Sequence, residues 1–255
     1  MITTYKYIGE TPLQVVERMR VAHNIAKDVK MAYAGRLDPM AQGVMIILVG
    51  DECLTRREYE LLEKEYEFEM LCGVETDTYD VMGIVQNQKV AAKSDHLQKN
   101  EVDEVLNSYV GHFEQSYPPY SAPRVNGHPL FWWAREGRLA EIDIPTHKVH
   151  IYSAQMFAKR TITAQEVVAY ATERIGHTTT ADAFRQPAIV DSWNAWLANQ
   201  PHTASLSIFS GRVVCSSGTY IRAICYEVGR KLGVGAIAYS ITRTRVGDRT
   251  YPTGE

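Results

Sequence analysis

Residues 64–83 read KEYEFEMLCGVETDTYDVMG, a strand-like run followed directly by a polar loop. Polar and apolar residues alternate in its first half, so Tyr66 and every second residue up to Cys72 are predicted to share one face of a half-buried strand. The second half holds Asp77 and Asp80 and closes on a glycine, which is typical of a loop. A single loop carboxylate most often caps a turn or a helix, so these two acids acquire a functional meaning only together with other segments.

A second carboxylate lies in residues 33–43, YAGRLDPMAQG. Asp38 stands among glycines and a proline, where turns can hold a side chain outside regular structure. Taken alone, an Asp-Pro pair is typical of an ordinary turn. The apolar run VMIILV at 44–49 follows and predicts a buried strand or a short helix.

The third informative stretch is residues 215–238, CSSGTYIRAICYEVGRKLGVGAIA. Gly218 and Thr219 are predicted to start a helix, which places Tyr220 and Arg222 in its first turn. There the positive end of the helix and a guanidinium group both favour an anion. A single arginine in the first turn of a helix is common, so a functional role for Arg222 depends on which group faces its guanidinium.

Composition sets the broad class. The chain has 255 residues, 45% apolar and 22% charged, which is enough for a sizeable core. No apolar run is long enough to span a membrane and the start of the chain lacks a signal-peptide layout, so we expect a cytoplasmic protein without a membrane partner. The four cysteines form no C-x-x-C pair, and neither a Gly-rich phosphate loop nor a His/Cys ligand spacing occurs, so we expect no metal and no cofactor.

The net charge of −3 hides a local excess of positive charge, because residues 201–255 carry seven basic and three acidic side chains. We expect this region to line a cleft and a few of its cations to contact phosphate. The candidates are Arg212, Arg222, Arg230, Lys231, Arg243, Arg245 and Arg249, with Arg124, Arg135 and Arg138 as a second wall.

Taken together, these segments resemble the bacterial TruB-type tRNA pseudouridine-55 synthase family over about residues 5–155 and 205–247. The matching blocks, in the family's order, are YIGETPLQVVERMR, GRLDPMAQGVM, KEYEFEMLCGVETDTYDVMG, YPPYSAPRVNGHPLFWWAREGR and CSSGTYIRAICYEVGRKLGVGAIAYSITRTRVG. The resemblance implies an α+β pseudouridine synthase core: a mostly antiparallel mixed sheet, flanked by helices, with a central active-site cleft. It also implies a single catalytic domain over 1–255, with an insertion at about 160–202 and without the C-terminal RNA-binding domain of the PUA type that many members carry.

The resemblance carries roles onto matching residues. Asp38 becomes the nucleophile, Tyr66 the tyrosine that stacks on the target base and takes part in proton transfer, and Arg222 the partner of Asp38. Substrate-binding positions are Asp80, an active-site carboxylate, Tyr220, a second pocket tyrosine, and Ile241, the aliphatic wall of the base where the family usually has leucine.

Two positions depart from the family pattern. Tyr33 stands where the family usually has a histidine that touches the RNA at the flipped site; a tyrosine there can contact RNA or pack against the core. In the proline-rich segment Arg124 replaces a common lysine and keeps the charge.

Within 160–202, Trp193 and Trp196 are predicted to pack rather than to stack on RNA.

The expected function is isomerisation of one uridine in a structured RNA to pseudouridine. Positive charge develops at the sugar as the glycosidic bond breaks, which suits a carboxylate, and the base must leave its stack to react. We expect the T arm of tRNA, with uridine 55, as substrate and a monomeric enzyme. Two alternatives stay open: an RNA chaperone on the same fold, and a nucleoside or glycoside hydrolase.

Overall fold

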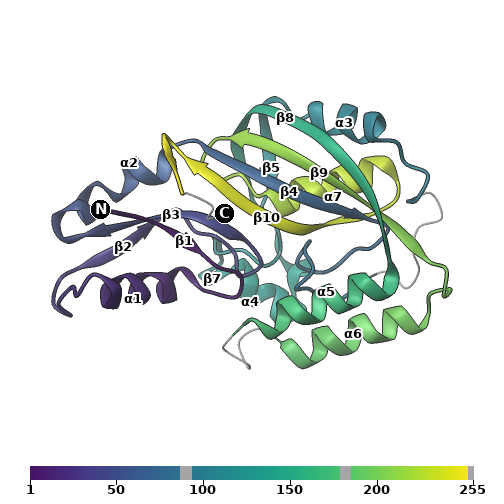
Figure 1. Cartoon of the computed structure of the whole chain (residues 1–255), viewed down its shortest axis with the longest axis horizontal. Coiled ribbons are helices and arrows are strands. Elements are labelled where there is room, and N and C mark those ends of the chain that lie inside the picture. Colours follow the sequence, from purple (N-terminus) through teal and green to yellow (C-terminus); the bar gives the residue numbers. More distant parts are fainter. Residues whose placement is uncertain (87–93, 179–184, 252–255) are drawn as a thin grey trace.

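The computed structural model describes residues 1–86, 94–178 and 185–251. Within them nine strands form one sheet. Helices lie on both faces of this sheet (Figure 1), so the expected α+β class is confirmed. The strands of this sheet, in chain order, are β1 (Ile2–Lys6), β2 (Met31–Ala34), β3 (Gln42–Val49), β4 (Lys64–Cys72), β5 (Gly111–Ser116), β8 (Thr146–Thr163), β9 (Ser205–Cys215), β10 (Ala236–Val246) and β11 (Arg249–Thr250).

Across the sheet the strands lie in the order β1, β3, β10, β4, β9, β8 and β5, with β2 paired to β3 and β11 paired to β10. The pairing of β3 with β10 is parallel and the other pairings are antiparallel, so the sheet is mixed and mostly antiparallel, as expected. A separate small hairpin joins β6 (Arg124–Val125) and β7 (His128–Pro129).

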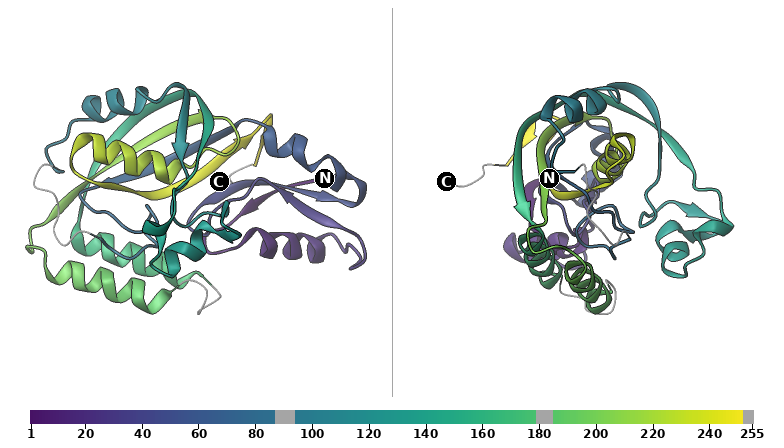
Figure 2. Two further views of the ribbon diagram at one scale, coloured as in Figure 1. Left: turned by 180° about the vertical axis from the view of Figure 1, so that it is seen from behind. Right: turned by 90° about the vertical axis from the view of Figure 1, so that its right-hand side faces the viewer.

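Helices cover the two faces of the sheet unequally. They are α1 (Pro12–Ala22), α2 (Arg56–Leu61), α3 (Lys99–Asn107), α4 (Leu130–Arg135), α5 (Ala164–Gly176), α6 (Gln186–Ala198) and α7 (Ile221–Leu232), with short 3-10 turns at Gly50–Thr55 and Leu139–Glu141. Figure 2 shows α3 and α7 together on one face of the sheet. Helices α5 and α6 lie side by side and pack against the other face.

The pleat of the sheet separates two hydrophobic clusters. On β4, Met70 and Cys72 belong to the cluster under α3 and α7, whereas Leu71 belongs to the cluster with α5 and α6. Neighbouring residues of a strand point to opposite faces, so this split follows directly from the alternation in the sequence. The predicted strand face that begins at Tyr66 is therefore confirmed as a core face.

Helix α7 packs closely on the sheet because it contains a glycine at the contact. A Cβ on Gly229 would lie 2.3 Å from the backbone nitrogen of Ala236 in β10, so a larger side chain would push the helix away. The first turn of α7 carries Arg222, and this close contact fixes its height above the sheet.

The paired helices α5 and α6 share their hydrophobic cluster with the sheet. Thr163 caps α5 by accepting the amide of Glu166, and the indoles of Trp193 and Trp196 are buried. Trp193 also donates its Nε1 hydrogen to the carbonyl of Val81, 3.1 Å away. The prediction that the two tryptophans pack is confirmed. None of the helices in the described ranges is long and apolar enough to cross a membrane.

Candidate active site

Asp38 lies in a loop between β2 and β3 whose backbone is held at several points. The carbonyl of Asp38 accepts the amide of Ala41, and the carbonyl of Pro39 accepts the amide of Gly9. The buried Lys6 donates from Nζ to the carbonyl of Ala41 at 2.6 Å. The Asp38 side chain keeps 30% of its surface exposed, so the carboxylate can face a ligand from a rigid loop.

Arg222 meets Asp38 directly. Its Nε donates to Asp38 Oδ2 at 2.8 Å, and the Arg222 side chain is only 3% exposed. The other two guanidinium nitrogens donate to the carbonyls of Thr78 at 2.7 Å and Tyr120 at 2.8 Å. Burial works to lower the pKa of Arg222, but the charges of Asp38 and Asp80 outweigh it and raise the pKa, so the guanidinium stays charged. The expected contact between the two residues is thus present in the structure.

Both residues of this ion pair line a cavity of about 330 Å³. Tyr66 of β4 and Ile241 of β10 line it beside Asp38, Arg222 and Tyr220. Burial raises the pKa of Tyr66, so its phenol is protonated near neutral pH. An aromatic ring, an aliphatic wall and a carboxylate therefore border one hollow, which suits a planar base next to a charged sugar.

Tyr220 lies just before helix α7, whereas the sequence predicted it in the first turn of this helix. Helix α7 begins at Ile221, and Tyr220 is the extended N-cap residue rather than part of the first turn. The physical reason is Gln115 of β5, whose Oε1 accepts the Tyr220 amide at 2.9 Å and whose Nε2 donates to the Tyr220 carbonyl at 3.1 Å. Burial first, and then the charge of Asp38, raise the pKa of Tyr220 to about 12.

A second cavity of about 350 Å³ shares Asp38 and Arg222 with the first and is also lined by Tyr33 and Asp80. Asp80 is buried and accepts hydrogen bonds from Thr78 Oγ1 at 2.8 Å and from the amide of Met82 at 2.9 Å. Burial raises the pKa of Asp80 to about 6, against the lowering effect of Arg222.

Tyr33 both packs and faces the cavity. It is half-buried against the main hydrophobic cluster, and its hydroxyl accepts a hydrogen bond from Arg36 at 3.4 Å. The guanidinium carbon of Arg56 lies 5.2 Å from the centre of its ring. Both expectations for Tyr33, packing and access to a ligand, are compatible with this position.

The structure adds residues that motif spacing alone did not single out as site residues. Arg36, Tyr120, Phe131 and Arg185 line the second cavity together with Asp38. Arg36, two residues before Asp38, could have been found from its proximity in sequence. Arg185 could not, because it lies far along the chain and reaches the cavity only through the packing of α6.

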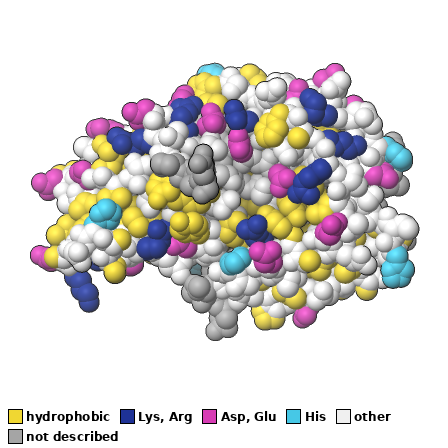
Figure 3. Space-filling model, in the orientation of Figure 1, with side chains coloured by type: hydrophobic (Ala, Val, Ile, Leu, Met, Phe, Trp, Pro, Cys, Tyr) yellow, Lys and Arg dark blue, Asp and Glu magenta, His cyan; other side chains and the backbone are white. Residues whose placement is uncertain are grey.

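The expected stripe of phosphate-binding cations is wrong for two residues, which are buried. Arg222 and Arg243 are buried, and Arg243 donates to the carbonyls of Val44, Arg36 and Gly35, so it braces the loop before Asp38 instead of facing solvent. Arg212 and Arg245 form ion pairs with glutamates of the neighbouring strand region. On the face of the molecule drawn in Figure 3, basic side chains are interspersed with acidic ones.

Comparisons with known proteins agree with this fold. The chain shares its fold with a chain in the crystal structure of a Cbf5-Nop10-Gar1 complex, at a TM-score of 0.54 and 18% identity, over 95% of this chain and 47% of that one. A chain in the structure of an H/ACA RNP bound to a substrate RNA containing 2′-deoxyuridine gives a TM-score of 0.52 at 16% identity, over 95% and 46%. These likenesses show that the chain has the same fold as these two proteins.

The sequence defines the family. The model of the TruB family pseudouridylate synthase (N terminal domain) matches residues 23–171. A protein of Clostridium acetobutylicum named tRNA pseudouridine synthase B is 29% identical over 97% of this chain and 67% of its own length. A protein of the same name from Clostridium perfringens is 30% identical over 98% and 67%, and one from Thermotoga maritima 29% over 98% and 63%. The chain belongs to the TruB family of pseudouridylate synthases, and it spans about two thirds of the length of these relatives.

Proposed function

We propose that this protein converts one uridine of a structured RNA to pseudouridine, with the T arm of tRNA and uridine 55 as the substrate. The observation that carries the proposal is the buried Arg222 guanidinium on the Asp38 carboxylate, at the junction of two cavities that both contain this pair. The names of the relatives and the family model support the reaction and an RNA substrate. Neither the chaperone nor the hydrolase alternative has an observation of its own in its favour.

The reaction exchanges one bond of the nucleotide for another. The N1–C1′ bond breaks, the base turns in its pocket, and C5 joins C1′, while C5 loses a proton and N1 gains one. Asp38 serves as the nucleophile, because a carboxylate suits the positive charge that develops at the sugar. Arg222 donates from Nε to Asp38 Oδ2, so the buried guanidinium aims this carboxylate.

The remaining site residues hold the flipped nucleotide. Tyr66 offers its ring as a stacking face and remains protonated, so it can donate a hydrogen bond during proton transfer. Ile241 and Tyr220 border the same cavity as Tyr66, and Asp80 and Tyr33 line the second cavity. The two cavities provide room for the target base and for a neighbouring part of the RNA.

Residues 1–255 are proposed to act as one catalytic domain and as a monomer. The hydrophobic cluster that joins α5 and α6 to the sheet supports treating the segment 160–202 as a helical insertion within that domain. Light scattering of the purified protein should give a mass near the 28.8 kDa of the chain. A mass of twice that value would contradict the monomer.

The test is nucleotide-resolution mapping of pseudouridine after incubation with unmodified tRNA transcripts. We expect one modified uridine in the T loop, its complete loss in Asp38→Asn, and full retention in Asp248→Asn, whose side chain is 90% exposed. Modification at another position would keep the chemistry and change the substrate. Tight binding of tRNA without pseudouridine would contradict the proposed activity, and an active Asp38→Asn would contradict the role of the nucleophile.

A further inference from the structure

Arg185 brings a further guanidinium to the cavity that is lined by Asp38 and Arg222. It immediately precedes helix α6, so it comes from the segment that shares no block with the family resemblance described above. The catalytic scheme leaves it without a task, although its side chain is only one quarter exposed.

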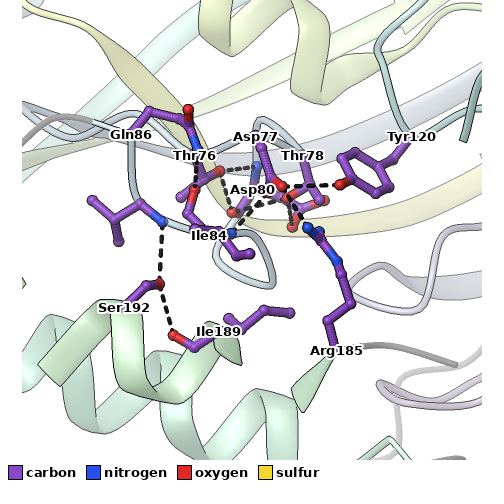
Figure 4. Close-up of polar contacts among 11 residues, drawn as sticks. Thr76, Asp77, Thr78, Asp80, Ile84, Gln86, Tyr120, Arg185, Ile189 and Ser192 are labelled. Atoms are coloured by element: carbon purple, nitrogen blue, oxygen red, sulfur yellow. Dashed lines mark hydrogen bonds and ion pairs between the residues drawn. The ribbon is translucent and has the colours of Figure 1, made fainter. Parts of the chain in front are cut away.

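The contacts of Arg185 join two loops, as Figure 4 shows. Its Nη1 donates to Asp77 Oδ2 at 2.7 Å, and the hydroxyl of Tyr120 donates to the same oxygen at 3.0 Å. The other Asp77 oxygen accepts the amide of Ile84 at 2.8 Å. The guanidinium carbon of Arg185 also lies 4.4 Å from the centre of the Tyr120 ring. Arg185, Asp77 and Tyr120 therefore form one cluster, which we call the loop clamp.

The loop clamp ties the same two loops that Arg222 holds. The loop of Asp77 supplies the Thr78 carbonyl to Arg222, and the loop of Tyr120 supplies its own carbonyl to the third nitrogen of the same guanidinium. Any separation of the two loops would thus remove two of the acceptors that orient Arg222. Because Arg222 in turn orients Asp38, the loop clamp acts on the reacting carboxylate indirectly, through Arg222.

Helix α6 gives the loop clamp a fixed base. Gln186 Nε2 donates to the carbonyls of Thr178 at 2.7 Å and Ile175 at 3.1 Å, which joins the start of α6 to the end of α5. Ser192 Oγ accepts the amide of Val85 at 3.2 Å, so α6 also holds the loop of Asp77 directly (Figure 4). Arg185 itself has a φ of 54°, an uncommon backbone region for a residue other than glycine that persists only where its surroundings hold it.

We infer that Arg185 is a positioning residue for the proposed synthase reaction: through Asp77 and Tyr120 it holds the two loops that aim Arg222 at Asp38. This inference rests on the proposed function. It assigns the segment around α6 a task at the active site, in addition to its packing on the sheet. A loosely held Arg222 would leave the RNA bound but misplace the carboxylate, and small misplacements of a reacting group are costly to the chemical step.

The experiment is single-turnover pseudouridine formation on a tRNA transcript, with the rate and the half-saturating enzyme concentration determined separately. For Arg185→Gln we expect the rate at saturation to fall about tenfold or more while the half-saturating concentration changes less than about twofold. Tyr120→Phe should lower the rate in the same way, and combining it with Arg185→Gln should cost less than the product of the two losses. Arg185→Lys should recover part of the rate, because an ammonium can pair with Asp77 but cannot stack on Tyr120.

A matched control comes from the same helical pair. Arg174 of α5 also lies over a tyrosine ring, 4.5 Å from the centre of Tyr170, but it does not line either cavity. Arg174→Gln should leave both constants unchanged. Hydrogen exchange of the Ile84 amide, which needs no activity, should accelerate in Arg185→Gln and not in Arg174→Gln.

The outcomes separate the two proposals. An inactive wild-type protein would contradict the proposed function, whatever the hydrogen exchange shows. An active wild-type protein whose Arg185→Gln variant keeps its saturated rate would overturn the positioning role. A variant that loses only affinity, with a weaker salt dependence, would overturn it in favour of a direct phosphate contact by Arg185.

Discussion

Asp80 allows a quantitative prediction about how stability depends on pH. Its carboxyl is buried, and burial raises its pKa from 3.8 to about 6 in the folded protein. Between these two values folding takes up a proton, so the contribution of the neutral carboxyl is fully present below pH 3.8 and is lost as the pH rises through 6. Each unit of pKa shift corresponds to about 1.4 kcal/mol, so the whole effect amounts to about 3 kcal/mol.

The perturbation is Asp80→Asn, which removes the titration but keeps an oxygen that can accept from Thr78 and Met82. Urea unfolding gives the free energy of unfolding of both proteins from pH 4.5 to 7. Relative to the variant, the wild type should lose about 2 kcal/mol over this range. Taking the difference cancels the titration of groups that both proteins share.

A control and a refuting result complete the design. Asp248→Asn changes an exposed carboxylate, and its stability relative to the wild type should stay constant over the same range. If the difference between the wild type and Asp80→Asn is also constant within about 0.5 kcal/mol, the argument that burial holds a proton on Asp80 is refuted.

Two further predictions concern stability. Arg243→Met removes a buried guanidinium from three carbonyls and should lower the free energy of unfolding by about 3 kcal/mol or more. Arg212→Met breaks an exposed ion pair with Glu67 and should lower it by less than about 1 kcal/mol. Equal losses for the two variants in urea unfolding would contradict this prediction. Trp193→Ala empties a fully buried position and should cost about 3–5 kcal/mol, measured the same way, and a loss below about 1 kcal/mol would show that α6 is not part of the cooperative core.

Local pattern was sufficient for the elements near the site. The alternation after Lys64 predicted β4 and its core face, because the two-residue period of a strand is a local property. The start of α1 also depends on neighbouring residues alone, since Thr11 accepts the amide of Gln14 and Pro12 occupies the first turn. The start of α7 was predicted too early, since a side chain from β5 fixes Tyr220 in an extended conformation and no local signal contains that contact.

The distribution of charged residues along the chain was the least reliable predictor of where their side chains lie. The number of cations in 201–255 predicted an exposed stripe, but Arg222 and Arg243 are buried and donate hydrogen bonds to backbone carbonyls. An arginine has five donors and a long apolar stem, so it serves a buried junction as well as a phosphate. Only the surroundings decide between these uses.

The amino-acid sequence by itself determined the family, the α+β class and the residues whose types suit the chemistry, because motif blocks and hydrophobic periods are written along the chain. Tertiary structure decided which of these residues meet. Arg222 and Asp38 are 184 positions apart and touch only because α7 packs against the sheet beside the loop of Asp38. Arg185 joined the site for the same reason: hydrogen bonds and buried charges depend on distances in space, and spacing along the chain does not contain them.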